Sequence, residues 1–259
     1  VIKLTENVLP HGAYTALGLA AGVLCGILVA SLHAFASINL KADQTISGTA
    51  INMLAAALTV YVARLVTGSG NIPIVMGIVR DDIPFLSKIP VLGALFFSRS
   101  YWSTWLVLAV WGFSFWLLYS TSFGLRLRAC GEHPSAVESA GVNVRRMRWF
   151  GVLASGALSG LGGGVMLVTY SGEFNGSVAG LGFLSIAALI FGQWKPLGIL
   201  GATFFFGFFT TLANVSQAIP ALNVVPTVIF KVFPYIVTLV ALVFSSKHMS
   251  APAADGIPY

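Results

Sequence analysis

The chain has 259 residues, of which 57% are hydrophobic and only 8% charged, and its mean hydropathy is +0.89. About a quarter of the residues in a soluble domain are charged, so this composition excludes an ordinary globular enzyme and a disordered or coiled-coil protein. The net charge is +6, but the charged residues are too few and too scattered to form a nucleic-acid-binding surface. A membrane protein with basic cytoplasmic loops has a net charge of the same sign. Two cysteines, Cys25 and Cys130, form no disulfide framework, and we expect both to be reduced.

Seven apolar segments follow one another along the chain. A transmembrane helix needs about 20 mostly apolar residues. Stretches free of Asp, Glu, Lys and Arg, trimmed at Pro and Gly, give expected membrane segments at 12–37, 45–67, 101–123, 149–171, 181–194, 197–215 and 228–246. The segment 181–194 is too short to cross a bilayer comfortably, which predicts a broken or re-entrant helix. We therefore expect an all-α polytopic membrane protein, a single transmembrane domain over residues 1–259 with about six or seven membrane segments.

Glycines recur at every fourth position in two of these segments, where they predict close helix packing. The two sets are Gly18, Gly22 and Gly26, and Gly156, Gly160 and Gly164. A weak similarity between the segments that begin at Leu17 and Leu197 hints at the internal repeat common in transporters.

Two polar stretches interrupt the apolar pattern. Residues 69–100 contain three prolines and predict an irregular loop. Residues 125–148 contain five arginines against two glutamates, and this excess predicts a cytoplasmic loop. Counting membrane segments outward then places 69–100 and 173–180 outside the cell and the C-terminal tail in the cytosol.

A short helix is expected inside the basic loop. Pro134 suits the first position of a helix, and Gly141 suits the residue after its C-terminal end. About two helical turns lie between them, with small residues that form a compact knob suited to a cleft on a partner protein. An ordinary basic loop that only sets membrane topology remains the alternative.

Several stretches along the chain resemble one family of transport proteins. They are Leu40–Asn52, Ile89–Gly93, Gly124–Pro134, Gly182–Gly192, Trp194–Gly198, Pro234–Tyr235 and Ala251–Tyr259. In this order they resemble the permease subunits of ABC importers in the ribose and branched-chain amino acid permease superfamily. More narrowly, they look like the permeases of nucleoside importers served by BmpA-type binding lipoproteins.

The resemblance implies the partners of the chain and the role of the basic loop. A related permease would complete the pathway in the lipid of a bacterial inner membrane. A cytoplasmic ATPase would bind ATP and Mg²⁺, and an external lipoprotein would deliver the cargo. This chain itself would be no enzyme and hold no cofactor. The family usually has a further span before a segment that Lys3–Ala13 resembles only weakly here, and we expect this N-terminal span to be missing or divergent.

By the same resemblance, six residues of the basic loop would face the ATPase, and two arginines would orient the loop near lipid headgroups or the partner. The six are Gly131, Glu132, His133, Pro134, Ala136 and Gly141, and the arginines are Arg126 and Arg128.

Polar residues within the apolar segments are candidates for the substrate pathway, because polar groups in the bilayer are costly and mark transport routes. These candidates are Gln44, Asn52, Gln193, Trp194 and Lys195. Helix–helix hydrogen bonding or anchoring at the membrane interface remains an alternative for each of them. His33 is expected to be a packing residue. No spacing in the sequence indicates catalytic residues, a metal site or a phosphate-binding loop.

Other functions remain open from the sequence alone. The cargo could be a simple sugar or a branched-chain amino acid. The chain could also be an ATP-independent carrier or channel, in which 125–148 serves topology only, or a truncated remnant without function.

Overall fold

The computed structural model describes residues 2, 10–73, 78, 80, 87, 97–171, 173–178, 180–216, 226, 228–230, 232–233, 235–237, 251–257 and 259. Contacts divide the chain into two units, residues 1–177 with 253–259, and residues 178–252. The helices of the first unit are α2 (His11–Ala34), α3 (Gln44–Thr67), α4 (Trp102–Ser120), α5 (Ser122–Glu132), α6 (Pro134–Ser139) and α7 (Val144–Met166). Two π-helical turns, η1 (Phe35–Asn39) and η4 (Leu167–Ser171), extend α2 and α7.

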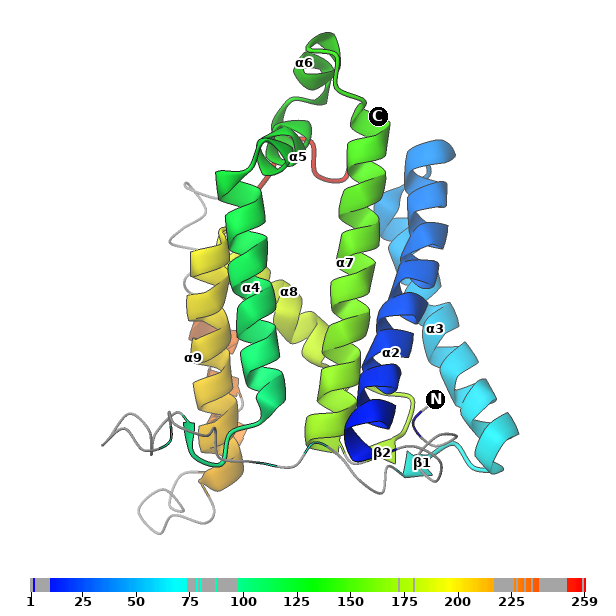
Figure 1. Ribbon diagram of the computed structural model, residues 1–259, viewed down its shortest axis with the longest axis vertical. Helices are drawn as coiled ribbons and strands as arrows, with labels where there is room; N and C mark the ends of the chain where they lie inside the picture. Colours follow the sequence, from blue (N-terminus) through cyan, green and yellow to red (C-terminus); the bar gives the residue numbers. More distant parts are fainter. Residues whose placement is uncertain are drawn as a thin grey trace. The chain divides into compact units, whose positions relative to one another are not determined.

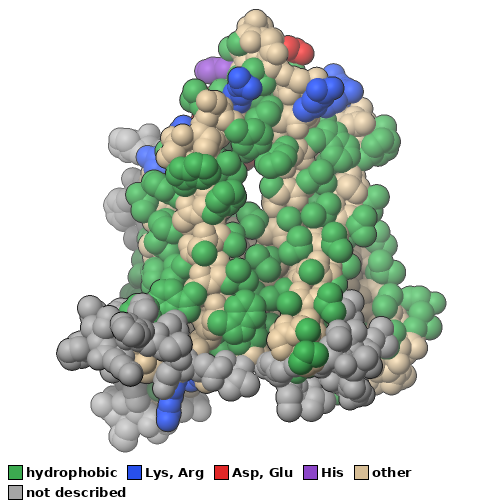
Figure 2. Space-filling view, in the orientation of Figure 1, with side chains coloured by type: hydrophobic (Ala, Val, Ile, Leu, Met, Phe, Trp, Pro, Cys, Tyr) green, Lys and Arg blue, Asp and Glu red, His purple; other side chains and the backbone are tan. Residues whose placement is uncertain are grey.

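The expected membrane segments 12–37, 45–67, 149–171 and 197–215 are confirmed as long helices, whereas the helix of the segment 101–123 ends at Ser120. Among the described residues, five helical stretches are long and apolar enough to cross a membrane, namely Gly12–Asn39, Gln44–Thr67, Trp102–Ser120, Val144–Tyr170 and Pro196–Val215. The expected segment 228–246 lies only partly within the described residues, which are helical at 228–230, 232–233 and 235–237. On the face seen in Figure 2, hydrophobic side chains cover much of the length of the helices, as a membrane protein requires.

The expected close packing of the glycine-rich segments is found between α2 and α7, which lie side by side and antiparallel (Figure 1). Gly22 faces Gly160, and Gly26 faces Gly156. A Cβ atom on Gly22 would stand 2.9 Å from the carbonyl oxygen of Gly160. Only glycine permits this approach of the two backbones, which is a common way for helices to associate in lipid.

Polar contacts join other pairs of elements in the first unit. His33 Nδ1 of α2 lies 3.0 Å from Ser47 Oγ of α3, so His33 is hydrogen-bonded as a packing residue would be. The indole N–H of Trp149 on α7 donates to Asn39 Oδ1 of η1 over 3.0 Å. The hydroxyls of Ser103 on α4 and Thr169 on η4 lie 3.2 Å apart.

One short sheet departs from the all-helical expectation. β1 (Ile72–Pro73) pairs antiparallel with β2 (Glu173–Phe174). Both strands lie in stretches expected outside the cell, and their pairing places these two stretches on the same side. Pro84 and Pro90 of the expected 69–100 loop lie outside the described residues.

The second unit contains α8 (Leu181–Phe191) and α9 (Pro196–Val215), which pack against each other. Ala188 of α8 and Ala202 and Phe206 of α9 form its buried core. α8 has 11 residues, about 17 Å at 1.5 Å per residue, which is shorter than a hydrocarbon core of about 30 Å. The prediction of a short helix at 181–194 is therefore confirmed, although its end is at 191.

Candidate functional site

The basic segment begins with a helix and not with the expected loop. α4 ends at Ser120, because Thr121 is extended (φ −116°, ψ 152°) and starts the new helix α5. The Thr121 hydroxyl accepts a hydrogen bond from the Gly124 N–H over 3.0 Å and so caps α5. Gly124 is buried against the backbone of Leu118. A Cβ on residue 124 would stand 2.5 Å from the Leu118 Cα. The expected span 101–123 is thus divided at this corner.

The short helix predicted from Pro134 is confirmed as α6, Pro134–Ser139. Pro134 is its first residue, where a missing N–H costs nothing. Gly141 follows with φ +80°, and its N–H donates to the Glu138 carbonyl over 2.9 Å. A residue with a Cβ is strained in this left-handed conformation, so glycine is well suited to end the helix here.

An apolar cluster holds α6 on its neighbours. Val137 of α6 is buried with Cys130 of α5 and with Val144 and Met147 of α7. The rest of α6 faces outward, since Ala136, Glu138 and Ser139 are exposed. α6 therefore projects from the ends of α5 and α7 as a small knob (Figure 1).

The residues predicted to face an ATPase gather at this end of the unit. Glu132, His133, Ala136 and Gly141 are exposed, and Gly131 and Pro134 are half-buried. Acidic, basic and histidine side chains are visible around this end in Figure 2. Arg126 is exposed, and the Arg128 guanidinium lies 4.5 Å from the ring centroid of Tyr119 on α4. This cation–π contact fixes Arg128 toward the membrane helix and not toward α6.

The segment 253–259 lies on the same surface and contacts α5, α6 and α7. The Ala254 N–H donates to the Gly131 carbonyl over 2.9 Å. The Arg148 guanidinium donates to the Ile257 carbonyl over 2.8 Å, and the Tyr259 hydroxyl donates to Glu138 Oε2 over 2.5 Å. No local sequence pattern links Tyr259 with Glu138 and Arg148, which lie more than 100 residues earlier in the chain, so these contacts were not predicted.

Two ionisable groups at this surface have raised pKa values. The hydrogen bond to Glu138 is the main reason why the pKa of the Tyr259 phenol lies above its ordinary value. Burial raises the pKa of the Cys130 thiol, and the nearby Arg148 charge opposes this in part. Cys130 is 3% exposed, so it is a poorly reactive thiol in this arrangement.

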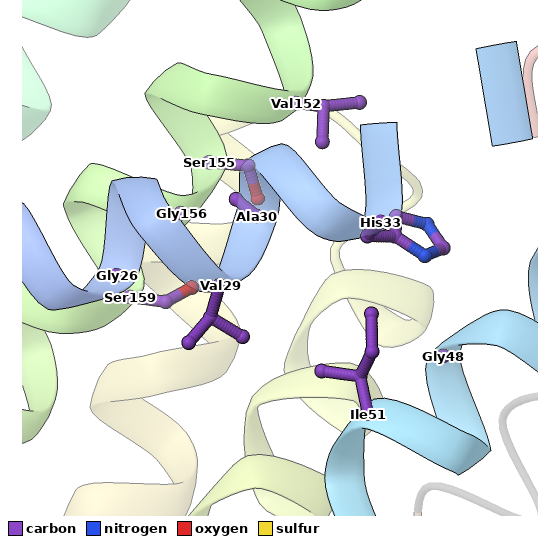
Figure 3. Close-up of a pocket in the computed structure, with 10 residues that line it drawn as sticks. All are labelled: Gly26, Val29, Ala30, His33, Gly48, Ile51, Val152, Ser155, Gly156 and Ser159. Atoms are coloured by element: carbon purple, nitrogen blue, oxygen red, sulfur yellow. The ribbon is translucent and has the colours of Figure 1, made fainter. Parts of the chain in front are cut away.

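A second candidate region is a hollow of about 280 Å³ between α2, α3 and α7. Its lining is mostly apolar, with polar side chains from His33, Ser155 and Ser159 (Figure 3). Ser155 and Ser159 lie one turn apart on α7, beside the glycines that contact α2. These serines were not among the predicted pathway residues, although their spacing of four residues on a glycine-rich helix was a usable signal.

The predicted pathway residues Gln44 and Asn52 both lie on α3, but they do not line this hollow. Gln44 is half-buried at the start of α3, and Asn52 is exposed. Gly48 and Ile51, which lie between them in the sequence, line the hollow instead. The two polar residues therefore flank the hollow along α3.

The predicted residues Gln193, Trp194 and Lys195 form the turn between α8 and α9. Gln193 and Trp194 both have left-handed backbones, with φ of 52° and 56°. The Trp194 N–H donates to the Leu189 carbonyl over 3.1 Å, and Lys195 N–H to the Gly192 carbonyl over 3.1 Å. Non-glycine residues are uncommon in this conformation, and consecutive ones indicate a turn fixed by its surroundings. Gln193 and Trp194 are half-buried, whereas Lys195 is exposed.

Similar proteins are transport permeases. Residues 2–242 match the family described as branched-chain amino acid transport system / permease component. The guanosine ABC transporter permease protein NupQ of Bacillus subtilis (strain 168) is 42% identical over 94% of this chain and 77% of its own length. The nucleoside ABC transporter permease protein NupC of Lactococcus lactis subsp. cremoris (strain MG1363) is 41% identical over 92% of this chain and 75% of its own.

A shorter match covers 35% of this chain and 26% of the relative, at 36% identity. That relative is the nucleoside ABC transporter permease protein NupB of the same Lactococcus lactis strain. No solved structure matches the chain. The length of the family match and the identity to these relatives establish that the chain belongs to the family of permease components of branched-chain amino acid transport systems.

Proposed function

We propose that this chain is the permease subunit of an ABC importer for nucleosides and forms half of its translocation pathway. The observation that carries the proposal is the identity of 42% and 41%, over more than nine-tenths of this chain, to relatives named as guanosine and nucleoside permeases. The five membrane-length helices suit a transport role. In this proposal, a separate cytoplasmic ATPase binds ATP and Mg²⁺ and hydrolyses the ATP.

The knob formed by α6 is the proposed docking point for that ATPase. Its exposed residues are small or polar, and Val137 anchors it to a cluster shared by α5 and α7. Movement of the ATPase would therefore reach the membrane through α7, which is separated from α6 by four residues and packs on α2. Such a helix acts as a two-state element that a distant ligand biases. Glu132, His133 and Pro134 run from the last residue of α5 to the first of α6, and their change should disturb docking most.

The remaining parts of the assembly follow from this docking point. Residues 125–148 would lie in the cytosol of a bacterial cell, as their excess of arginine favours. The contacts of 253–259 with α5, α6 and α7 would keep that segment on the same side. A related permease would complete the pathway, a role that the existence of both NupB and NupC in one strain supports. An external lipoprotein would supply the nucleoside.

The pathway itself is proposed to run past the polar residues of the membrane helices. Ser155, Ser159 and His33 offer hydroxyl and imidazole groups for a ribose or a base in the hollow between α2, α3 and α7. Gln44 and Asn52 flank that hollow on α3. In the second unit, the strained turn at Gln193 and Trp194 is the other candidate, since transporters bind substrates at broken helices.

Uptake by the reconstituted transporter tests the function. The chain is placed in liposomes with its partner permease, ATPase and binding lipoprotein, and ATP-dependent entry of radiolabelled guanosine is measured. Competition by other nucleosides, but not by a simple sugar or a branched-chain amino acid, is the expected result. Competition by the sugar or the amino acid alone would reassign the cargo, and uptake without ATP would indicate a carrier or channel.

A further inference from the structure

The segment Ala253–Tyr259 contacts each of the three helices that form the α6 knob. It contacts the end of α5 through Gly131, α6 through Glu138, and α7 through Arg148. The partners in two of these hydrogen bonds are separated by 121 and 109 residues in the sequence. A segment far away in the sequence thus contacts three helices that follow one another directly along the chain.

α6 is too short to keep its orientation unaided. It has six residues, about 9 Å of helix, and isolated helices shorter than about 12 residues are marginal in water. Within the described chain Val137 is its one buried residue. Both of its ends are irregular, since His133 has φ −136° and ψ 80° and Gly141 is left-handed. A helix that must transmit movement needs a further attachment.

Tyr259 supplies this attachment in two ways. Its ring packs against the cluster of Cys130, Val137, Val144 and Met147, and the Arg148 guanidinium lies 5.6 Å from the ring centroid. Its hydroxyl donates to the Glu138 carboxylate of α6, and a hydrogen bond to a charged acceptor is shorter and stronger than one between neutral groups. Arg148 in turn donates to the Ile257 carbonyl. One tyrosine is therefore attached to α6 and α7 at once.

We propose that Ala253–Tyr259 is a clamp that fixes α6 on α7, and that Tyr259 is the positioning residue through which the clamp supports coupling to the ATPase. This inference rests on the proposed function for its second half, whereas the clamp itself is a property of the permease alone. The two halves can therefore fail separately.

The buried thiol of Cys130 reports directly on the clamp. Cys130 and Cys25 are the two cysteines of the chain, so a Cys25→Ser variant leaves one thiol, next to the Tyr259 ring. The full-length permease is placed in nanodiscs, and the rate of maleimide modification is measured at neutral pH. Tyr259→Ala is expected to raise the rate about tenfold or more, because it opens the cluster locally. Tyr259→Phe and Glu138→Gln keep the ring and are expected to give smaller increases.

Asp255→Asn is the matched control, since Asp255 lies exposed in the same segment, and the rate of this variant should equal that of the parent. Equal rates for the parent and Tyr259→Ala would overturn the clamp. A rate that rises when the ATPase binds the unmodified permease would also overturn it, because the segment would then be displaced by the partner and would not support it.

The coupling half is tested in the assembled transporter. Tyr259→Phe, which retains the ring, is expected to capture the ATPase. The ratio of nucleoside-stimulated to basal ATPase activity is expected to fall to half of the parental ratio or less. A residue that served only folding would change the yield of assembled transporter and leave this ratio unchanged. A normal ratio in Tyr259→Phe and Tyr259→Ala would overturn the positioning role. Failure of the unmodified chain to capture any ATPase would overturn the proposed function instead, while the Cys130 rates would still decide on the clamp.

Discussion

Gly156 lies against the backbone of Gly26 where α7 crosses α2, and a Cβ on Gly156 would stand 2.6 Å from the carbonyl oxygen of Gly26. The neighbouring pair, Gly22 and Gly160, is equally close. Since backbone atoms cannot rotate away, the contact specifies glycine on both helices. The packed pair of α2 and α7 thus lines the hollow, and the start of α7 supports the α6 knob.

Gly156→Val should therefore separate α2 from α7. The expected cost is about 1–3 kcal/mol or more, as for an overpacked core, and it should appear as a lower melting temperature of the detergent-solubilised permease. Gly163→Val on the same helix is the control, because a Cβ at Gly163 meets nothing within 4 Å. Equal melting temperatures for the two variants would show that the glycine contact does not hold these helices together.

The corner between α4 and α5 gives a second prediction. Gly124→Ala places a Cβ against the backbone of Leu117 and Leu118, so α5 must tilt and take α6 with it. We expect reduced ATPase capture by a chain that still inserts in the membrane. Gly112→Ala within α4 meets no atom within 4 Å and should capture as the parent does. Capture by Gly124→Ala at the parental level would mean that the corner does not set the position of α6.

The membrane segments could be predicted because long apolar runs between charges have few alternatives in a bilayer. The expected segments 45–67 and 197–215 differ from α3 and α9 by one residue at one end. The position of α6 was predictable too, because proline favours the first position of a helix and glycine a position just after its end.

The corner at Thr121 was not predictable in the same way. Residues 119–124 contain no charge and no proline, so the rule used to delimit the membrane segments ran through the break. The cap of Thr121 and the close packing of Gly124 reveal it in the structure. The contact between Tyr259 and Glu138 depends on how three helices fold together. Which residues of α3 face the hollow also depends on the rotation of the helix, which places Gly48 and Ile51 in the lining; a pathway role of Gln44 and Asn52 stays a prediction.

The titration of Tyr259 gives a prediction on pH. Its pKa is raised, so the protonated phenol is favoured while Tyr259 is hydrogen-bonded to Glu138. The stabilising effect is present below the ordinary phenol pKa of about 10 and is lost as pH rises through the higher pKa of the folded protein. The difference in phenolate absorbance between the parent and Tyr259→Phe isolates this one tyrosine, and its midpoint should lie above 10. The same difference measured in a Glu138→Ala background should move toward the ordinary value, and an unchanged midpoint there would remove Glu138 as the cause.

The hollow between α2, α3 and α7 can be tested by filling it. Ser155→Leu adds an apolar side chain to its lining and should lower guanosine uptake severalfold if cargo passes there, because a nucleoside needs both the space and the hydroxyl. Ser114→Leu, on α4 and away from the hollow, is a control for adding bulk to a membrane helix. ATPase capture should persist in both variants, and full uptake by Ser155→Leu would place the pathway elsewhere.

Coupling through α6 is tested most directly by co-purification of the ATPase subunit from membranes. The parent chain is compared with a variant changed at Glu132, His133 and Pro134, and insertion is checked for both. We expect the parent to capture the ATPase and the variant to lose it. Equal capture by both chains would contradict docking through α6, and no capture by a well-inserted parent would contradict the assignment of the chain to an ATP-driven importer.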